Sequence, residues 1–377
     1  MNVSSSTPFY IGLMSGTSLD GVDGVLVDFS NSMHVIAHAS CPLDASLRAE
    51  LLALNQMDGS NELHRAALAA NALVKHYAQV VVQLLSSTGR PASEIAAIGA
   101  HGQTVRHRPQ MFDGTGYTLQ LNAPALLAEL TGITVVADLR SRDVAAGGQG
   151  APLVPAFHQQ VFGRNDTGTL VLNIGGISNL SVLEANGGVL GFDCGPGNAL
   201  MDAWCLQHTG KAYDANGAWA ATGHVVEPLL QHMLAESYFQ LSPPKSTGRD
   251  LFHTVWLAQQ LQTVPKAAHA TPADIQATLT ELTAACCADA ALRWGKASSE
   301  LLVCGGGALN GYLMQRIAAR LPAVHVGSTA ERGLPPLEVE AAAFAWLARQ
   351  CLQGLSGNLP AVTGAKGSRI LGAIYPA

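Results

Sequence analysis

Phe9 to Phe29, FYIGLMSGTSLDGVDGVLVDF, contains the pattern that decides the fold. An apolar run ends in a turn of glycine, serine, threonine and aspartate, and a second apolar run follows it. Short apolar runs bounded by such polar clusters are typical of β-strands joined by a turn. The sequence therefore predicts a strand, a polar turn and a second strand near the start of the chain.

Two later stretches repeat this plan in part. Thr169 to Glu184, TLVLNIGGISNLSVLE, again reads as a strand, a Gly-rich turn and a strand. Leu301 to Ile317, LLVCGGGALNGYLMQRI, predicts a buried strand, a triple-Gly turn and an amphipathic helix. The first two stretches lie about half the chain apart, which a duplicated two-domain architecture would produce.

Ala- and Leu-rich stretches with apolar residues at three- and four-residue spacing lie between these strands and predict helices. The expected helices are Leu47 to Leu54, Glu62 to Leu85, Pro272 to Trp294 and Leu337 to Leu355. The third of them is expected to bury Leu279, Leu282 and Leu292. Alternating strands and helices indicate the α/β class.

The polar, turn-forming segment GRNDTG at Gly163 to Gly168 predicts the domain boundary. We therefore expect an N-terminal lobe over residues 1–167 and a C-terminal lobe over residues 168–377. A chain of 377 residues is long enough for two domains that each bury a core.

Composition excludes several classes of protein. With 48% hydrophobic and 13% charged residues, the chain is not disordered. A net charge of −6 argues against a nucleic-acid-binding surface, for which a basic patch is expected. The N-terminus, MNVSSSTPFY, lacks the features of a signal peptide, and no apolar run reaches the ~18–20 residues of a membrane span. We expect a cytoplasmic protein whose seven scattered cysteines are reduced thiols.

The Gly-rich turns are the candidate sites for chemistry. In Gly16 to Gly21, GTSLDG, the glycines allow a ligand to approach the backbone, and successive N–H groups can cradle an anion. Asp20 and Asp23 would repel a phosphate, so a role through a divalent cation and its waters fits them better. A single turn of this kind is more simply a tight hairpin that satisfies its own backbone. Two such turns with a triple-Gly turn favour a nucleotide site.

The repeated strand–turn–strand pattern, followed by strand, triple-Gly turn and helix, is similar to the fold of actin, hexokinase and heat-shock-chaperone ATPases. Within that fold the chain resembles the anhydro-N-acetylmuramic acid kinase family along nearly its whole length. The motifs that carry the resemblance are IGLMSGTSLDGVD (Ile11 to Asp23), HGQTVRH (His101 to His107), ADLRSRDVAAGGQGAPLVPAFH (Ala137 to His158), LNIGGISN (Leu172 to Asn179), GFDCGPGNALMDAW (Gly191 to Trp204), PKSTGRD (Pro244 to Asp250) and VCGGGALN (Val303 to Asn310).

The resemblance implies a duplicated actin-like, ribonuclease H-like α/β fold with a nucleotide cleft between two lobes, the C-terminal helix packing back on the first. It implies an ATP- and Mg²⁺-dependent kinase that opens the 1,6-anhydro ring of 1,6-anhydro-N-acetylmuramic acid by hydrolysis and phosphorylates oxygen 6. The products would be N-acetylmuramic acid 6-phosphate and ADP, in the recycling of bacterial cell-wall sugars. The family resemblance also implies a homodimer, with no nucleic-acid or membrane partner.

The resemblance further implies which residues bind the nucleotide and the sugar. The nucleotide contacts are Gly16, Thr17, Ser18, Leu19, Asp20, Gly21, Val22 and Asp23, then Gly175, Gly176, Ser178 and Asn179, and finally Gly305, Gly306 and Gly307. The sugar contacts are Ser15, His101 and Glu340, with Arg140 or Arg142 pairing with the lactyl carboxylate. His101 is also compatible with a purely structural role, satisfying a backbone carbonyl at a strand end. No direct metal ligand is assigned, and Asp20 or Asp23 would act through water.

Asp193 is the central candidate. It lies in GFDCGPGN just before a predicted helix, so from the residues alone it is equally a helix N-cap or a catalytic group. The resemblance implies the general base, which activates the water that attacks carbon 1 of the sugar. Two other functions stay open: an ordinary hydroxyl kinase in which Asp193 deprotonates an alcohol, and an ATP-driven binding protein such as an actin-like filament or a chaperone-type clamp.

Overall fold

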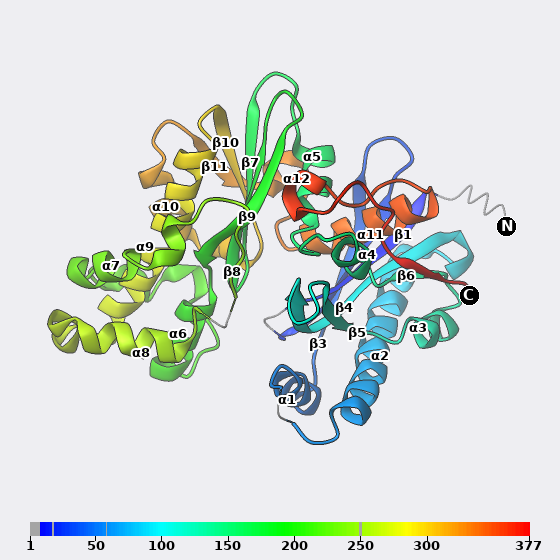
Figure 1. Ribbon diagram of the computed structural model, residues 1–377, viewed down its shortest axis with the longest axis horizontal. Helices are drawn as coiled ribbons and strands as arrows, with labels where there is room; N and C mark the ends of the chain where they lie inside the picture. The colour runs from blue at the N-terminus through cyan, green and yellow to red at the C-terminus, as the bar shows by residue number, and fades with distance from the viewer. Residues whose placement is uncertain (1–7, 17–18, 58, 249–250) are drawn as a thin grey trace. The chain divides into compact units, whose positions relative to one another are not determined.

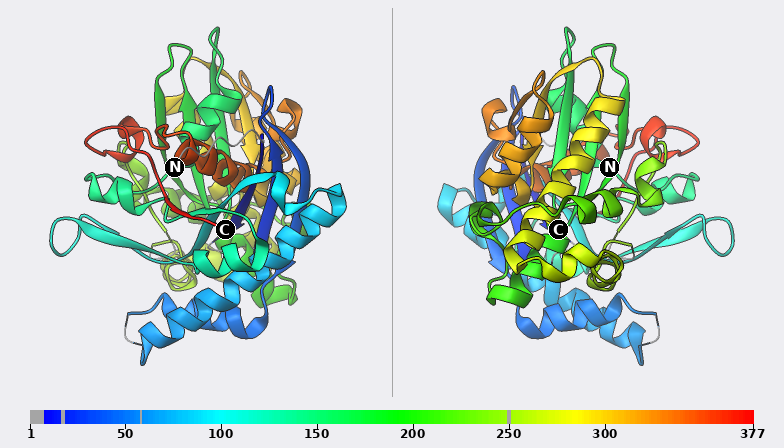
Figure 2. Two further views of the ribbon diagram at one scale, coloured as in Figure 1. Left: turned by 90° about the vertical axis from the view of Figure 1, so that its right-hand side faces the viewer. Right: turned by 90° about the vertical axis from the view of Figure 1, so that its left-hand side faces the viewer.

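The computed structural model describes residues 8–16, 19–57, 59–248 and 251–377, which form two compact α/β units (Figure 1). Unit 1 comprises Met1–Phe157 and Glu338–Ala377, and unit 2 comprises His158–Leu337. This division differs from the expected one at residues 167 and 168. The GRNDTG segment joins helix α5 (Val154–Phe162) to the first strand of unit 2, so it is a turn inside that unit. In Figure 2 the C-terminal segment, in red, returns to the blue strands of unit 1.

Unit 1 contains a mixed sheet with the strand order β3-β2-β1-β4-β6-β12, and β5 pairs with the far part of β4. The first three strands are antiparallel, and β4 and β6 then run parallel to β1. The strands are β1 (Phe9–Ser15), β2 (Gly21–Asp28), β3 (His34–Pro42), β4 (Ile95–Pro109), β5 (Gly116–Leu121), β6 (Val135–Ala137) and β12 (Ala373–Tyr375).

Unit 2 repeats this topology. Its strand order is β9-β8-β7-β10-β11, with three antiparallel strands followed by two that run parallel to the first. The strands are β7 (Gly168–Ile174), β8 (Ile177–Leu183), β9 (Val189–Pro196), β10 (Ser298–Cys304) and β11 (His325–Ser328). The shared order and directions confirm the predicted duplicated actin-like fold. The two strand–turn–strand patterns of the sequence are β1-β2 and β7-β8.

All four predicted helices form. The helices of unit 1 are α1 (Ala45–Leu54), α2 (Glu62–Thr88), α3 (Pro124–Thr131), α4 (Ser141–Ala145), α11 (Val339–Leu352) and α12 (Pro360–Thr363). Those of unit 2 are α6 (Ala199–Thr209), α7 (Glu227–Leu234), α8 (Thr254–Thr263), α9 (Pro272–Trp294) and α10 (Gly311–Arg320). No helix in the described part of the chain is long and apolar enough to cross a membrane.

One detail of α9 differs from the prediction. Leu279 and Leu282 are buried in the core of unit 2 as expected, but Leu292 is 53% exposed. Thirteen residues beyond Leu279, an α-helix has turned by a net angle of about 220°, because each residue adds about 100°. Leu292 therefore lies about 140° around the helix from Leu279, outside the side that packs on the core.

Helices cover both faces of the unit 1 sheet, and glycines allow one of them to come close. Gly12 and Gly99 are partners in adjacent strands β1 and β4. A Cβ atom added at Gly12 would lie 1.8 Å from the carbonyl oxygen of Ala341, and one at Gly99 would lie 1.9 Å from that of Phe344. The backbone of α11 thus rests directly on the sheet. Gly24, on the other face, meets the side chain of Val80 in α2.

We predict that Gly99→Ala destabilises unit 1 more than Gly24→Ala does. The new methyl group at position 99 meets helix backbone, which can yield only if α11 moves, whereas at position 24 it meets side-chain ends that can rotate. Overpacking a core lowers the free energy of unfolding by ~1–3 kcal/mol, and we expect the loss caused by Gly99→Ala to lie at or above the upper end of this range. Urea unfolding monitored by circular dichroism measures both. Equal shifts of the unfolding midpoint would contradict direct backbone packing.

Candidate functional site

The turn between β7 and β8 in unit 2 is open on one side. Its carbonyl groups hold it against the start of α6: Asn198 donates its backbone N–H to Gly175 O (2.8 Å), and Gly197 donates to Gly176 O (3.0 Å). A Cβ atom added at Gly175 or Gly176 would have no neighbour nearer than 3.7 Å. Packing within the protein therefore does not require these glycines, and their open faces let a ligand approach the backbone.

The triple-Gly turn lies beside this first turn. A Cβ atom would lie 2.4 Å from Asn173 Oδ1 at Gly305 and 2.4 Å from a side-chain carbon of Ile174 at Gly307, so both glycines pack on β7. At Gly306 the nearest atom would be 3.5 Å away, which leaves that face open. Two of the predicted Gly turns thus meet where β7 and β10 end and α6 begins.

A buried acceptor marks the same place. The Oδ1 atom of Asn173 is buried, and no described residue donates a hydrogen bond to it. Leaving a buried polar atom unpaired costs ~1–3 kcal/mol, which a bound ligand or water would recover. The adjoining open glycines and this unpaired oxygen fit a polar ligand such as a nucleotide.

Ser178 and Asn179, in β8, connect this turn to β9. The Ser178 hydroxyl is buried and donates to the carbonyl of Gly195 at 3.1 Å, so it is used within the protein. Asn179 pairs in register with Asp193 across the two antiparallel strands. The predicted nucleotide turn and the predicted catalytic aspartate therefore belong to one hairpin-like element.

Asp193 lies inside β9, and the N-cap of α6 is Asn198. The N-cap alternative for Asp193 is therefore wrong. Its carboxylate Oδ2 accepts a hydrogen bond from the backbone N–H of Thr247 at 2.9 Å. Its own backbone N–H donates to the carbonyl of Lys245 (3.2 Å), and its carbonyl accepts from the Tyr238 hydroxyl (2.8 Å). The backbone and one carboxylate oxygen of Asp193 are therefore held in place. No described residue donates a hydrogen bond to its other carboxylate oxygen, Oδ1.

The environment of Asp193 tunes its ionisation. Burial raises the pKa of this half-buried carboxyl to about 6, although the Thr247 N–H and the positive charge of Lys245 both lower it. A carboxylate with a pKa near 6 is ionised at neutral pH and is a stronger proton acceptor than an ordinary aspartate. Asp193 therefore has the electrostatics of a general base.

Unit 1 carries a second polar cluster, centred on Arg140. The Arg140 Nε–H donates to His101 Nε2 at 3.0 Å, and Nη1 donates to the carbonyl of Gly150 at 3.0 Å. Burial, with a further effect of Arg140, lowers the pKa of His101 to about 3. His101 is thus neutral, accepts from Arg140, and carries its proton on Nδ1. It lies within β4 and does not end a strand, and its ring packs on Phe344 at 4.7 Å.

Glu340, at the start of α11, belongs to the electrostatic surroundings of Arg140. Burial raises the pKa of this half-buried carboxyl, and Arg140 opposes that rise. Burial lowers the pKa of Arg140 to about 10, so its guanidinium is still charged at neutral pH. No salt bridge joins Arg140 to a carboxylate among the described residues. Its charge is therefore available to an anion.

The other predicted sugar contacts differ from Arg140. Arg142 is exposed on α4, and no described partner holds its side chain, so the structure separates the two arginine candidates. The hydroxyl of Ser15 is buried and donates to Gln103 Oε1 at 2.6 Å. Ser15 therefore stabilises the β1-β4 pair and would meet a ligand only if that bond rearranged.

The first Gly-rich turn is described only in part, since Thr17 and Ser18 lie outside the described residues. Gly21 packs against the backbone of Cys41, and the side chains of Leu19 and Val22 are buried, while Gly16 is half-buried. Asp23 contacts His38 at 3.3 Å, whereas the side chain of Asp20 is exposed. Within the described ranges, no three His, Cys, Asp or Glu side chains are grouped to hold a metal ion.

Two groups of functional partners were missed from the sequence. Lys245 and Thr247 lie in PKSTGRD, a motif that was noted without a role, and they fix Asp193 from more than fifty residues away. Asp143 lies in the motif Ala137 to His158, and no role was predicted for it from the sequence. Its buried carboxylate accepts from Gly150 N–H (2.8 Å) and from the Thr363 hydroxyl (2.8 Å). It thereby fixes the loop whose carbonyl holds Arg140.

Solved structures with similar folds are distant in sequence. An activator of 2-hydroxyisocaproyl-CoA dehydratase from Clostridium difficile, with bound ADPNP, has a TM-score of 0.47 and 14% identity, covering 92% of this chain and 96% of that one. A ROK family glucokinase from Streptomyces griseus, in complex with glucose and AMPPNP, has a TM-score of 0.42 and 13% sequence identity. The match covers 91% of this chain and 99% of the glucokinase chain.

Sequence relatives are much nearer. Proteins called anhydro-N-acetylmuramic acid kinase in Albidiferax ferrireducens and in Variovorax paradoxus are each 62% identical, covering 98% of this chain and 99% of the relative. The model of the family described as anhydro-N-acetylmuramic acid kinase matches residues 8–377. These matches exclude the alternative of an ATP-driven binding protein such as an actin-like filament or a chaperone-type clamp. With the whole chain matched, this protein belongs to the anhydro-N-acetylmuramic acid kinase family.

Proposed function

We propose that this protein uses ATP to open the 1,6-anhydro ring of 1,6-anhydro-N-acetylmuramic acid by hydrolysis and to phosphorylate oxygen 6. The products are N-acetylmuramic acid 6-phosphate and ADP, in peptidoglycan recycling and amino-sugar catabolism. Family membership supports the reaction. The observation that carries the mechanism is Asp193, with its pKa near 6 and its carboxylate held by the Thr247 N–H. The proposal includes a cytoplasmic homodimer.

Asp193 acts as the general base toward water. Its Oδ2 atom is occupied by Thr247, so Oδ1 is the atom that accepts a proton from the attacking water. The water oxygen bonds to carbon 1 of the sugar as the bond from carbon 1 to oxygen 6 breaks. Oxygen 6 bonds to the γ-phosphorus of ATP, and ADP leaves. The proton on Asp193 then passes to solvent, so atoms and charge balance.

The bond broken in the sugar is a glycosidic bond. An oxocarbenium-like carbon 1, with a carboxylate activating water on one side, is the arrangement of an inverting glycosidase. In such an enzyme a carboxylic acid protonates the leaving oxygen. Here the phosphoryl group captures it, so one catalytic carboxylate is sufficient.

The Gly turns are proposed to hold the phosphates of ATP. Phosphoryl transfer depends on alignment and charge neutralisation, which backbone N–H groups provide. The open faces at Gly175, Gly176 and Gly306 and the unpaired Asn173 Oδ1 fit such a ligand. The Gly16 turn supplies further donors. Mg²⁺, when bound, neutralises phosphate charge, and the exposed Asp20 would meet it through water, since Asp23 already contacts His38.

Arg140 is proposed to pair with the lactyl carboxylate of the sugar. Its guanidinium is charged and is held in one orientation by His101 and Gly150, as a fork-like pairing requires. Neutral His101 adds no competing charge. Glu340, whose carboxyl sits in the same cluster, would accept hydrogen bonds from hydroxyl or amide groups of the sugar.

We expect product formed in heavy-oxygen water to gain one phosphoryl group and one heavy oxygen at carbon 1. The protein is incubated with ATP, Mg²⁺ and 1,6-anhydro-N-acetylmuramic acid, and the product is read by mass spectrometry. Samples taken early are compared with product that was made in ordinary water and then transferred, because a reducing sugar exchanges that oxygen slowly. Phosphorylation with the ring intact would indicate an ordinary hydroxyl kinase, and no sugar product would leave only ATP binding.

Asp193→Asn is expected to lose turnover by ~10²–10⁴-fold or more, because an amide cannot accept the proton from water. Bound ATP, measured by calorimetry, is expected to be unchanged. The folded-state pKa of Asp193 is raised, so its contribution to stability is present at low pH and is lost as pH rises through about 6. At neutral pH the Asn variant should therefore melt no lower than wild type.

The same pKa predicts the pH profile. Activity of the wild type is expected to fall as pH drops through about 6, where Asp193 becomes protonated. Asp166→Asn, which alters an exposed carboxylate of unit 2, serves as the matched control and should keep full activity. An Asp193→Asn variant with more than about a tenth of wild-type turnover would contradict the general-base role.

Arg140→Gln is expected to reduce kcat/KM for the sugar by ~10–100-fold, mostly through KM, since a hydrogen bond to a charged group contributes ~1.5–3 kcal/mol. Arg142→Gln, which alters the exposed second candidate for the carboxylate contact, should change kcat/KM for the sugar by less than about twofold. Steady-state kinetics with sugar as the varied substrate measure both, and melting curves verify folding. A larger effect at Arg142 would assign the carboxylate to that residue.

A further inference from the structure

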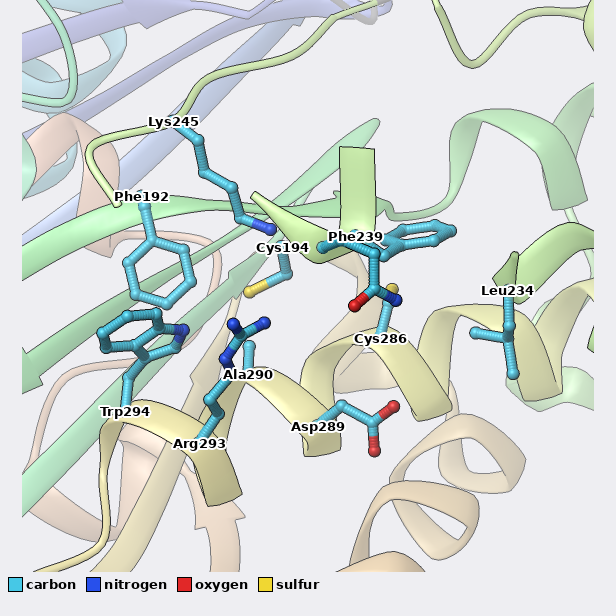
Figure 3. Close-up of a pocket in the computed structure, with 11 residues that line it drawn as sticks. Phe192, Cys194, Leu234, Phe239, Lys245, Cys286, Asp289, Ala290, Arg293 and Trp294 are labelled. Carbon is cyan, nitrogen blue, oxygen red and sulfur yellow. The ribbon is translucent and has the colours of Figure 1, made fainter. Parts of the chain in front are cut away.

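A cavity of about 250 Å³ lies in unit 2 beside β9, and Figure 3 shows the residues that line it. Phe192 and Cys194 of β9 both contribute to its wall. Asp193, which lies between them, is not among the residues that line the cavity.

Two cationic side chains enter this cavity, and neither forms a salt bridge with a described residue, although the charge of Lys245 also acts on the Asp193 carboxyl. Figure 3 shows the head groups of Lys245 and Arg293 directed into the same space. Within the described part of the chain, Lys245 Nζ donates to the carbonyl of Tyr238 at 3.3 Å, and the Arg293 guanidinium lies 5.4 Å from the centre of the Trp294 ring. Asp289 also lines the cavity, but among the described residues it forms no salt bridge with either. Like charges that share one space repel unless an anion lies between them.

The remaining wall is aromatic. Phe192, Phe239 and Trp294 line the cavity, and Phe192 is 1% exposed. Flat apolar rings favour a flat apolar ligand, which can stack on them or meet their edges. The volume is below the roughly 300–1,000 Å³ of most small-molecule pockets, so the ligand is small. The walls select a small anion that carries a planar apolar group.

Lys245 connects the cavity to Asp193. Its side chain lines the cavity, while its carbonyl accepts a hydrogen bond from the backbone N–H of Asp193 at 3.2 Å. Two residues later, Thr247 donates its N–H to the Asp193 carboxylate. A ligand that binds the Lys245 ammonium would therefore restrain the short segment that holds Asp193 in place.

We propose that this cavity binds a small carboxylate or phosphate carrying a planar apolar group, and that the bound anion rigidifies residues 245–247 around Asp193. The binding site stands on its own geometry. Only the relevance of this rigidification to catalysis rests on the proposed function of Asp193.

Phenyl phosphate is the probe for binding to the full chain by calorimetry. We expect saturable binding of phenyl phosphate. Inorganic phosphate and phenol should each bind at least about tenfold more weakly than phenyl phosphate, because each of them lacks either the apolar ring or the charged group. Arg293→Gln should weaken binding by about tenfold or more, whereas Lys296→Gln, an exposed cation outside the cavity, should leave it unchanged. Equal affinity in both variants would overturn the site, as would displacement of the probe by saturating ATP.

The coupling has its own readout. Bound phenyl phosphate should slow hydrogen exchange at the amide of Thr247, which is measured by mass spectrometry or NMR, and Arg293→Gln should abolish the effect. Unchanged exchange at saturating probe would overturn the coupling to Asp193. Asp193→Asn should bind phenyl phosphate no more weakly than wild type does, because it removes a negative charge that acts on Lys245, so failure of the catalytic proposal would leave the binding result intact.

Discussion

The contact between the backbone of α11 and the paired glycines of β1 and β4 decides the arrangement of unit 1. With any side chain at Gly12 or Gly99, the added carbon would lie less than 2 Å from a carbonyl oxygen of the helix, far inside van der Waals contact. Glycine at both positions lets α11 rest on the sheet, although the helix comes from the far end of the chain. Because Phe344 of this helix packs on the His101 ring, the same contact also sets the place of Glu340 near Arg140.

A second constraint secures the residues that follow α11. The carboxylate of Asp143 is fully buried, which is affordable only because its oxygens are occupied: Oδ1 by Asn358 Nδ2 (2.6 Å) and Thr363, Oδ2 by the Gly150 N–H. Gly150 in turn supplies the carbonyl that holds Arg140. The orientation of the guanidinium thus depends on contacts between segments more than two hundred residues apart. Removing Asp143 would leave several buried donors unpaired at once.

The sequence predicted the local features of this molecule well. The strand–turn–strand patterns, the triple-Gly turn and the helix over Pro272 to Trp294 depend on neighbours a few residues apart, and all of them form. Leu292 was misplaced because spacing was read without following the rotation of the helix. The partners of Asp193 could not be derived locally, since Thr247 approaches it through a loop whose path depends on the whole of unit 2. The same holds for Asp143, whose carboxylate binds residues more than two hundred positions later in the chain. The return of the C-terminal segment to unit 1, by contrast, is what the family resemblance implied.

The charged groups of the two units differ in a way that suits different tasks. In the proposed mechanism Asp193 accepts a proton during turnover, and burial brings its pKa to about 6, close to neutral pH. The role proposed for Arg140, to hold a substrate anion, requires a constant charge, and even after burial its pKa is about 10. His101 completes this division: its pKa of about 3 keeps it a neutral acceptor that orients Arg140 without adding a charge that changes with pH. The same physical effect, loss of water around a charged group, thus brings the pKa of Asp193 close to neutral pH and leaves the charge states of Arg140 and His101 constant there.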